Sequence, residues 1–172
     1  FLSSPVEGLR KIAGEVVATG GGVDTLKAGD LVAVVPMRGC GHCPRCLAGD
    51  PARCPDMTLI GGGYADYVCV AARQCRVLPD GVAASDAALA EPLSVALHCI
   101  VRSGMKPGDR VAILGAGPIG LLVAFWARRL GAASVVMADL YDHQAERARA
   151  LGATGFALSG AGLSENLSDQ CG

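Results

Sequence analysis

The first half of the chain consists of short apolar runs separated by glycine and proline, a pattern typical of β-strands joined by turns. The expected strands cover residues 14–20, 30–36, 64–71 and 75–79. Runs of this kind predict a small antiparallel barrel or sandwich. Residues 38–56 contain no such run and are expected to protrude from it as a lobe.

The pattern changes near residue 85, where longer stretches with helical spacing begin. Residues 85–104 are expected to be helical, with Ser85 as N-cap, Gly104 as the stop and Pro92 as a break or the start of a second helix. Strands and helices then alternate, which predicts the first half of a doubly wound α/β domain. The strands are expected at 110–114, 134–139 and 155–159, and the helices at 121–131 and 142–153.

Composition excludes several classes of protein. Hydrophobic residues make up 51% of the 172 residues but aromatic ones only 4%, so Val, Ala, Leu and Ile must build the core. A formal net charge of −1 does not favour nucleic acid. No apolar run is expected to approach the ~20 residues that span a bilayer. A reducing cytoplasm is the expected location, and the polar ends, beginning at Phe1, predict part of a longer protein.

The most specific chemical signal is the run CGHCPRCLAGDPARC, which contains Cys40, Cys43, Cys46 and Cys54. Three thiolates spaced three residues apart can converge from one loop, and the fourth can complete a tetrahedral zinc site. Such a site has no open position, so the zinc is expected to be structural. A disulfide framework is the alternative, but no signal segment precedes the cysteines. A redox CxxC pair would leave two cysteines at ligand distance unexplained.

The run GAGPIG directly follows an expected strand and opens an expected helix, a context that indicates a dinucleotide site. Gly115 permits the tight turn, Gly117 lets the pyrophosphate approach the backbone, and Gly120 lets the helix pack closely on the sheet. Free amides at the helix N-terminus would then face the phosphates. Pro118 and Ile119, which lie between Gly117 and Gly120, are expected to belong to this cofactor site.

Asp139 ends the next expected strand. Its carboxylate would accept hydrogen bonds from the hydroxyls of the adenosine ribose. A negative charge at this position repels the 2′-phosphate of NADP, so NAD is the expected cofactor in preference to NADP. The alternative is a glycine turn in an α/β fold that binds no nucleotide.

These motifs, in this order, resemble the zinc-containing medium-chain alcohol dehydrogenases, most closely the polyol (sorbitol) and threonine dehydrogenase branch. The resemblance covers nearly the whole chain and includes GEVVATGGGVDTLKAGDLVAVVP, GGYADYV, LPDGVAASDAALAEPLSVALH and KPGDRVAILGAGPIG. It implies a partial GroES-like β-barrel catalytic domain over residues 1–95, with a structural-zinc lobe at 38–56. It also implies the first half of an NAD-binding Rossmann fold over residues 96–172.

The resemblance does not extend to the family's catalytic zinc. The family's His-Glu ligand pair falls on Arg10 and Lys11, and neither side chain is a zinc ligand. Glu91 matches a position where related enzymes use Glu as a metal ligand or as a partner of the zinc-bound water. Alone it cannot hold a catalytic zinc, which needs three protein ligands. His98 is expected to pack or hydrogen-bond, and His42 to face solvent.

Together these features predict a zinc-containing, NAD(P)-dependent oxidoreductase that transfers hydride between a secondary alcohol or polyol and NAD. Two alternatives stay open. One is a superfamily member without catalytic zinc, either a reductase or a non-catalytic zinc- and nucleotide-binding protein, and the other is an inactive fragment. The resemblance further implies a small-molecule alcohol or polyol as partner, no nucleic acid, no membrane, and a homo-oligomer in the intact protein.

Overall fold

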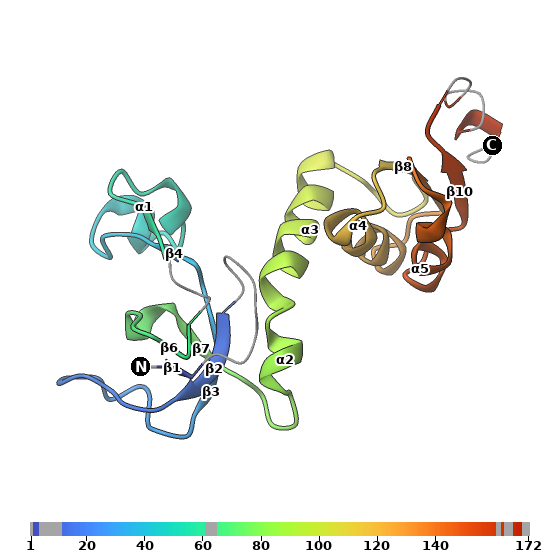
Figure 1. The fold of residues 1–172 in the computed structure, drawn as a ribbon. Coiled ribbons are helices and arrows are strands. Elements are labelled where there is room, and N and C mark those ends of the chain that lie inside the picture. Colours follow the sequence, from blue (N-terminus) through green and yellow to red (C-terminus); the bar gives the residue numbers. More distant parts are fainter. Residues whose placement is uncertain (1, 4–11, 61–64, 161–162, 164–166, 170–172) are drawn as a thin grey trace. The chain divides into compact units, whose positions relative to one another are not determined.

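The computed structural model describes residues 2–3, 12–60, 65–160, 163 and 167–169 (Figure 1). The chain divides into two units, Phe1–Glu91 and Pro92–Gly172, whereas the domains expected from the sequence meet between residues 95 and 96. The elements of the first unit are β1 (Leu2–Ser3), β2 (Ile12–Val16), β3 (Leu31–Val34), β4 (Met37–Arg38), α1 (Pro44–Leu47), η1 (Pro51–Arg53), β5 (Thr58–Leu59), β6 (Tyr67–Val68), η2 (Ala72–Gln74), β7 (Cys75–Val77) and α2 (Ala84–Ala87).

Five of these strands form an antiparallel sheet in the order β6-β1-β2-β3-β7. The strand expected at 14–20 begins earlier, at Ile12, and ends at Val16. After three more residues the chain reaches three consecutive glycines, and it turns there, where Gly22 has a φ of 79°. The run expected at 64–71 forms only the short β6, and its first residue lies outside the described part of the chain.

Both faces of the β2–β3 pair are covered in this unit. On one face, larger side chains form an apolar cluster that includes Ile12, Val16, Val32 and Val34. On the other face, the small side chains of Ala13 and Ala33 leave room for α2 to pack directly on the strands. Ala13 lies in the cluster with Ala87 and Ala88, at and just after the end of α2. Alternation of large and small residues along the strands therefore determines which face accepts the helix.

The lobe between β3 and β6 has almost no apolar core. The strands β4 and β5 pair at its base, and Ile60 N donates to Pro36 O at 2.9 Å beside them. Neither α1 nor η1 contains a buried residue. A segment this long, with so few buried apolar side chains, needs another source of stability.

The second unit is an α/β structure with a parallel sheet in the order β10-β9-β8. The chain order of strands and helices is the one expected from the sequence. Its elements are α3 (Ala90–Ser103), which begins at the boundary between the units, β8 (Arg110–Leu114), α4 (Pro118–Arg129), β9 (Ser134–Asp139), η3 (Asp142–Gln144), α5 (Ala145–Ala150) and β10 (Gly155–Leu158).

The central strand β9 and helix α4 form the core of this unit. Four consecutive residues of β9, from Val135 to Ala138, have no solvent exposure, as expected for a strand covered on both faces. Helix α4 places Ala124 and Ala127, both fully buried, in the same cluster. Trp126 Nε1 donates to Leu93 O at 2.9 Å and so joins α4 to α3.

The helical region after residue 83 differs from the expectation in detail. Helix α2 starts at Ala84 after Ala83, which makes no side-chain cap, so Ser85 is not the N-cap. The break comes before Pro92, which lies buried in the first turn of α3, where a missing amide costs little. The expected stop at Gly104 is confirmed, because this residue follows α3 with a φ of 73°.

The stretch Ala84–Ser103 is 20 residues long with a mean hydropathy of 1.2, so by length and composition it is a candidate membrane span. This corrects the expectation that no apolar run approaches such a length. Core helices of soluble proteins pass the same test, and this stretch also carries Asp86, Glu91 and Arg102. Its apolar character is therefore weak evidence for a membrane.

Candidate zinc lobe and nucleotide site

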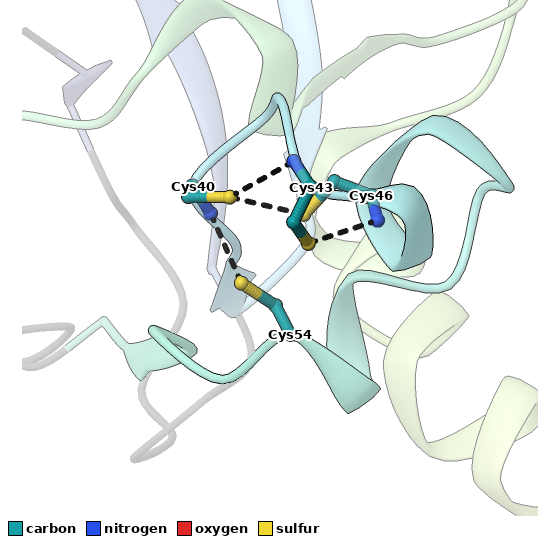
Figure 2. A group of neighbouring side chains, drawn as sticks. All are labelled: Cys40, Cys43, Cys46 and Cys54. Carbon is teal, nitrogen blue, oxygen red and sulfur yellow. Dashed lines mark hydrogen bonds between the residues drawn. The ribbon is translucent and has the colours of Figure 1, made fainter.

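The four cysteines Cys40, Cys43, Cys46 and Cys54 converge in the lobe, as the sequence predicts (Figure 2). Their sulfur atoms all lie within 4.8 Å of one another, and the sulfurs of Cys40 and Cys46 are 4.0 Å apart. Four sulfurs around one zinc at Zn–S distances of about 2.3 Å would be about 3.8 Å apart. The donor set and its dimensions therefore suit one tetrahedral zinc ion.

Backbone amides point at the sulfurs and fix the positions of the ligands. Cys43 N donates to Cys40 Sγ at 3.3 Å, Cys46 N to Cys43 Sγ at 3.5 Å, and Cys40 N to Cys54 Sγ at 3.3 Å. Gly41 has a φ of 90°, which lets the chain turn between the first two cysteines. These donors stabilise negative charge on sulfur, the form that binds metal.

The thiols differ in acidity because their surroundings differ. Amides of His42 and Cys43 lower the pKa of Cys40 to about 6. The pKa of Cys46 is raised to about 11. The Gly41 amide lowers it, but burial and the neighbouring thiols of Cys43, Cys54 and Cys40 raise it more. At neutral pH Cys40 is thus a thiolate, whereas Cys46 holds a proton that zinc must displace.

Two side chains from η2 tie the lobe to the sheet. Arg73 Nη2 donates to Gly39 O at 2.8 Å. Gln74 is only 3% exposed, and its Nε2 donates to Val35 O at 3.0 Å and Met37 O at 3.2 Å. Because this buried amide group has hydrogen-bond partners, its burial does not destabilise the fold. These contacts hold β4, and with it the first cysteine, in place.

Gly39 is expected to be essential to the metal site. A Cβ at this position would lie 2.5 Å from Cys46 Sγ and 3.3 Å from Cys54 Cβ. Gly39→Ala must therefore displace a ligand, with an expected cost of about 1–3 kcal/mol, or roughly 5- to 150-fold in zinc affinity. The measurement is zinc transfer to a coloured chelator. Gly21→Ala is the matched control, because its Cβ would meet no atom within 4 Å, and equal zinc affinity in the two variants would contradict the packing argument.

The glycine turn between β8 and α4 has the geometry that its sequence predicts. Gly115 has a φ of 102°, which favours glycine. A Cβ on Gly120 would overlap the carbonyl oxygen of Gly115 and lie 3.5 Å from Met137 Cε. A Cβ on Gly117 would meet no protein atom within 4 Å. Two of the three glycines thus serve the turn itself, while the space beside Gly117 is open to a ligand.

Helix α4 begins directly at this turn. Gly117 is its N-cap and Pro118 its first residue, so the helix starts three residues before the expected residue 121. Proline suits this position because its fixed φ is helical and no amide is required there. The amides of Ile119 and Gly120 lie in the first turn of α4, where helix amides lack partners from within the helix. This helix end is suited to a phosphate group.

Asp139 lies at the carboxyl end of β9, beside the turn. Its Oδ2 accepts a hydrogen bond from Ala116 N at 2.6 Å, and its Oδ1 accepts one from Tyr141 N at 3.2 Å. The amide of Ala116, followed by those of Tyr141 and Leu140 and by nearby His143, holds the pKa of Asp139 below its usual value. The carboxylate is therefore ionised at physiological pH, which suits recognition of ribose hydroxyls and disfavours an added phosphate.

The remaining candidates do not form a second metal site in the described residues. The four cysteines are the one group of three or more potential ligands found there. Glu91 is half-buried in the first turn of α3. His98 is exposed on the same helix instead of packed, and His42 is exposed as expected. The positions of the expected ligand pair, 10 and 11, lie outside the described residues.

Sequence reasoning missed the residues that support the two sites. Arg73 and Gln74 lie far from the cysteines in sequence, and nothing in the local pattern marks them. Gly39 directly precedes the first cysteine, and this adjacency was an available signal for close packing. The bond from Ala116 to Asp139 joins two residues already known from the motif, but only the structure shows that they touch.

A four-cysteine lobe on an antiparallel sheet and a glycine turn in a parallel α/β unit are the two features by which this chain can be compared with known proteins. Residues 3–80 match the family model for the alcohol dehydrogenase GroES-like domain. This match confirms the predicted resemblance to the zinc-containing medium-chain alcohol dehydrogenases.

Similarity to known dehydrogenases extends over both units. The chain is 37% identical over 147 residues to sorbitol dehydrogenase from Bacillus subtilis (strain 168), which covers 83% of this chain and 42% of that protein. The crystal structure of galactitol-1-phosphate dehydrogenase from Escherichia coli matches with a TM-score of 0.82 and 33% identity, over 94% of this chain and 49% of that one. The crystal structure of a short chain alcohol dehydrogenase from Escherichia coli CFT073, complexed with NADH, matches with a TM-score of 0.85 and 30% identity, over 94% of this chain and 50% of that one. The chain thus spans about half the length of these relatives.

Proposed function

We propose that this chain is part of an NAD-dependent dehydrogenase that transfers hydride between a secondary alcohol or polyol and the cofactor. The observation that carries the proposal is the turn from Gly115 to Gly120, with Asp139 beside it at the end of the neighbouring strand. The similarity to sorbitol and galactitol-1-phosphate dehydrogenases supports the substrate class. Reduction of NAD in the presence of a panel of secondary alcohols and polyols is the direct test.

The pyrophosphate and the adenosine ribose of the cofactor each have a proposed partner in the chain. The pyrophosphate lies against Gly117, where no side chain intervenes, and against the helix start at Pro118, Ile119 and Gly120. Gly115 shapes the turn, and the ribose hydroxyls donate to Asp139. Bound NAD supplies the hydride acceptor, and the protein orients it.

Zinc has a structural role in this proposal. The ligands are Cys40, Cys43, Cys46 and Cys54, and a shell of four sulfurs has no open position for a substrate. The metal replaces the apolar core that the lobe lacks. The lobe therefore contributes stability and takes no part in hydride transfer.

Glu91 is the proposed contribution of this chain to the reaction centre, by its match to the position used in related enzymes. One carboxylate cannot hold a catalytic metal, and the described residues offer no further cluster of ligands. This observation favours a second candidate function, a zinc-containing nucleotide-binding protein or reductase without catalytic zinc. Alcohol-dependent reduction of NAD distinguishes the dehydrogenase from this alternative.

The proposed partners follow from the same relatives. The substrate is a small alcohol or polyol, and neither nucleic acid nor a membrane is a proposed partner. The net charge of −1 supports the first exclusion. We place the protein in the cytoplasm, where the free thiols of the cluster remain reduced, and we propose a homo-oligomer for the complete protein.

NAD is expected to bind more tightly than NADP, by roughly 10-fold, because the 2′-phosphate of NADP would lie beside the ionised Asp139. The measurement is a calorimetric titration with each cofactor. Raising the salt concentration should narrow the difference, since screening weakens the repulsion. Equal affinities at low salt would contradict the proposed role of Asp139 at the ribose.

A further inference from the structure

The amide of Ala116 is a buried donor that needs a partner within the protein. Ala116, the second residue of the glycine turn, has no solvent exposure. The strand before it is paired with β9 up to Gly115, whose amide donates to Ala138 O at 2.7 Å. The chain then turns away from the sheet. Ala116 N donates to Asp139 Oδ2 at 2.6 Å, so a side chain continues the hydrogen bonding where the main chain of β9 no longer can.

Asp139 is itself firmly held. Its Oδ1 accepts from Tyr141 N at 3.2 Å, and its main-chain oxygen accepts from Ser159 N at 2.7 Å. Ser159 follows β10, and Ala116 follows β8. One residue therefore joins the carboxyl ends of all three strands of the sheet.

We propose that Asp139 is a positioning residue for the glycine turn, holding Ala116 so that the helix-start amides meet the pyrophosphate. This role adds to recognition of the ribose, and it rests on the nucleotide site proposed above. The two roles are compatible because an ionised carboxylate offers about four acceptor positions. Two are used by Ala116 and Tyr141, which leaves acceptor capacity for a ribose hydroxyl.

Two substitutions separate the hydrogen bond from the charge. Asp139→Asn keeps an acceptor oxygen for Ala116 N, whereas Asp139→Ala removes it. Both remove the same negative charge, so repulsion of phosphate changes equally in the two variants. A difference between them reports the bond to the turn.

The ligand that isolates positioning from ribose recognition is 2′,3′-dideoxy-ADP, which lacks both ribose hydroxyls but keeps the pyrophosphate. By titration calorimetry, Asp139→Asn is expected to bind this ligand at least as tightly as the wild type. Asp139→Ala is expected to bind about 10-fold more weakly than Asp139→Asn. Equal affinity of the two variants would overturn the positioning role.

A second readout does not depend on any nucleotide. Amide hydrogen exchange at Ala116 is expected to be slow in the wild type and in Asp139→Asn, and at least about 10-fold faster in Asp139→Ala. Equal exchange in the two variants would also overturn the proposal. If the wild type binds neither ADP nor NAD, the proposed function fails, and the exchange rates alone decide whether Asp139 positions the turn.

Discussion

Loss of one cysteine ligand is expected to empty the zinc site and unfold the lobe while the five-stranded sheet stays folded. Cys46→Ser should lower zinc affinity by more than about 100-fold, because changes to groups behind the ligands alone cost 10- to 100-fold. The lobe has no buried residue in α1 or η1, so the metal is its main source of stability. Amide hydrogen exchange over residues 37–59 is the measurement, and protection should disappear there but persist in β2 and β3.

Elemental analysis provides the stoichiometry, with one zinc per chain expected in the wild type. Cys69→Ser is the matched control, because Cys69 is an exposed thiol outside the cluster. Two zinc ions per chain would contradict the assignment of a single site.

Zinc affinity is also expected to fall as the pH is lowered. Cys46, with a pKa of about 11, must lose a proton to bind, and acid favours the protonated thiol.

Gly117→Val is expected to abolish nucleotide binding without unfolding the protein. A Cβ at Gly117 meets no protein atom within 4 Å, and the backbone there, with φ −71° and ψ 179°, accepts a branched residue. The new side chain would fill the space proposed for the pyrophosphate, and NAD affinity should fall at least about 100-fold, or about 2.7 kcal/mol. Calorimetric titration measures the affinity, and unchanged binding would contradict the proposed site.

Gly120→Ala is the matched comparison. It lies in the same turn, but it is expected to act on the stability of the fold instead of on the space for the nucleotide. Its Cβ would overlap the carbonyl oxygen of Gly115, so the helix must move away from the strand. We expect a loss of about 1–3 kcal/mol in the free energy of unfolding, measured by denaturant titration. Gly117→Val should leave this free energy close to the wild-type value. Equal destabilisation by the two changes would show that Gly117 also supports the fold.

The features that the sequence predicted best are those with strict local spacing. The cysteine run determines which sulfurs converge, because each turn of the loop is only a few residues long. The order strand, glycine turn, helix and strand likewise determines the βαβ unit, since β9 is a continuous apolar run buried on both faces. In both cases the residues that interact are close in sequence or belong to a repeating pattern.

The features that the sequence did not predict depend on contacts between segments that are distant along the chain. Gln74 is buried because the carbonyls of Val35 and Met37 receive its amide, and no local pattern marks that pairing. Strand β2 ends at Val16 although the sequence remains β-like beyond it, because its partner β3 pairs back only to Leu31. Cys69 and Cys99 have apolar neighbours in sequence yet are exposed, since burial depends on the side of the element that each occupies.

The hydrogen bond from Ile60 to Pro36, beside the paired strands β4 and β5, brings the two ends of the lobe together. When the two ends of a chain segment lie close together, the rest of the fold places little constraint on the length of that segment. We therefore expect the lobe to tolerate changes in its length without a shift in the register of β2, β3 and β7. Variation in this part of the molecule can accumulate independently of the segment that carries the glycine turn.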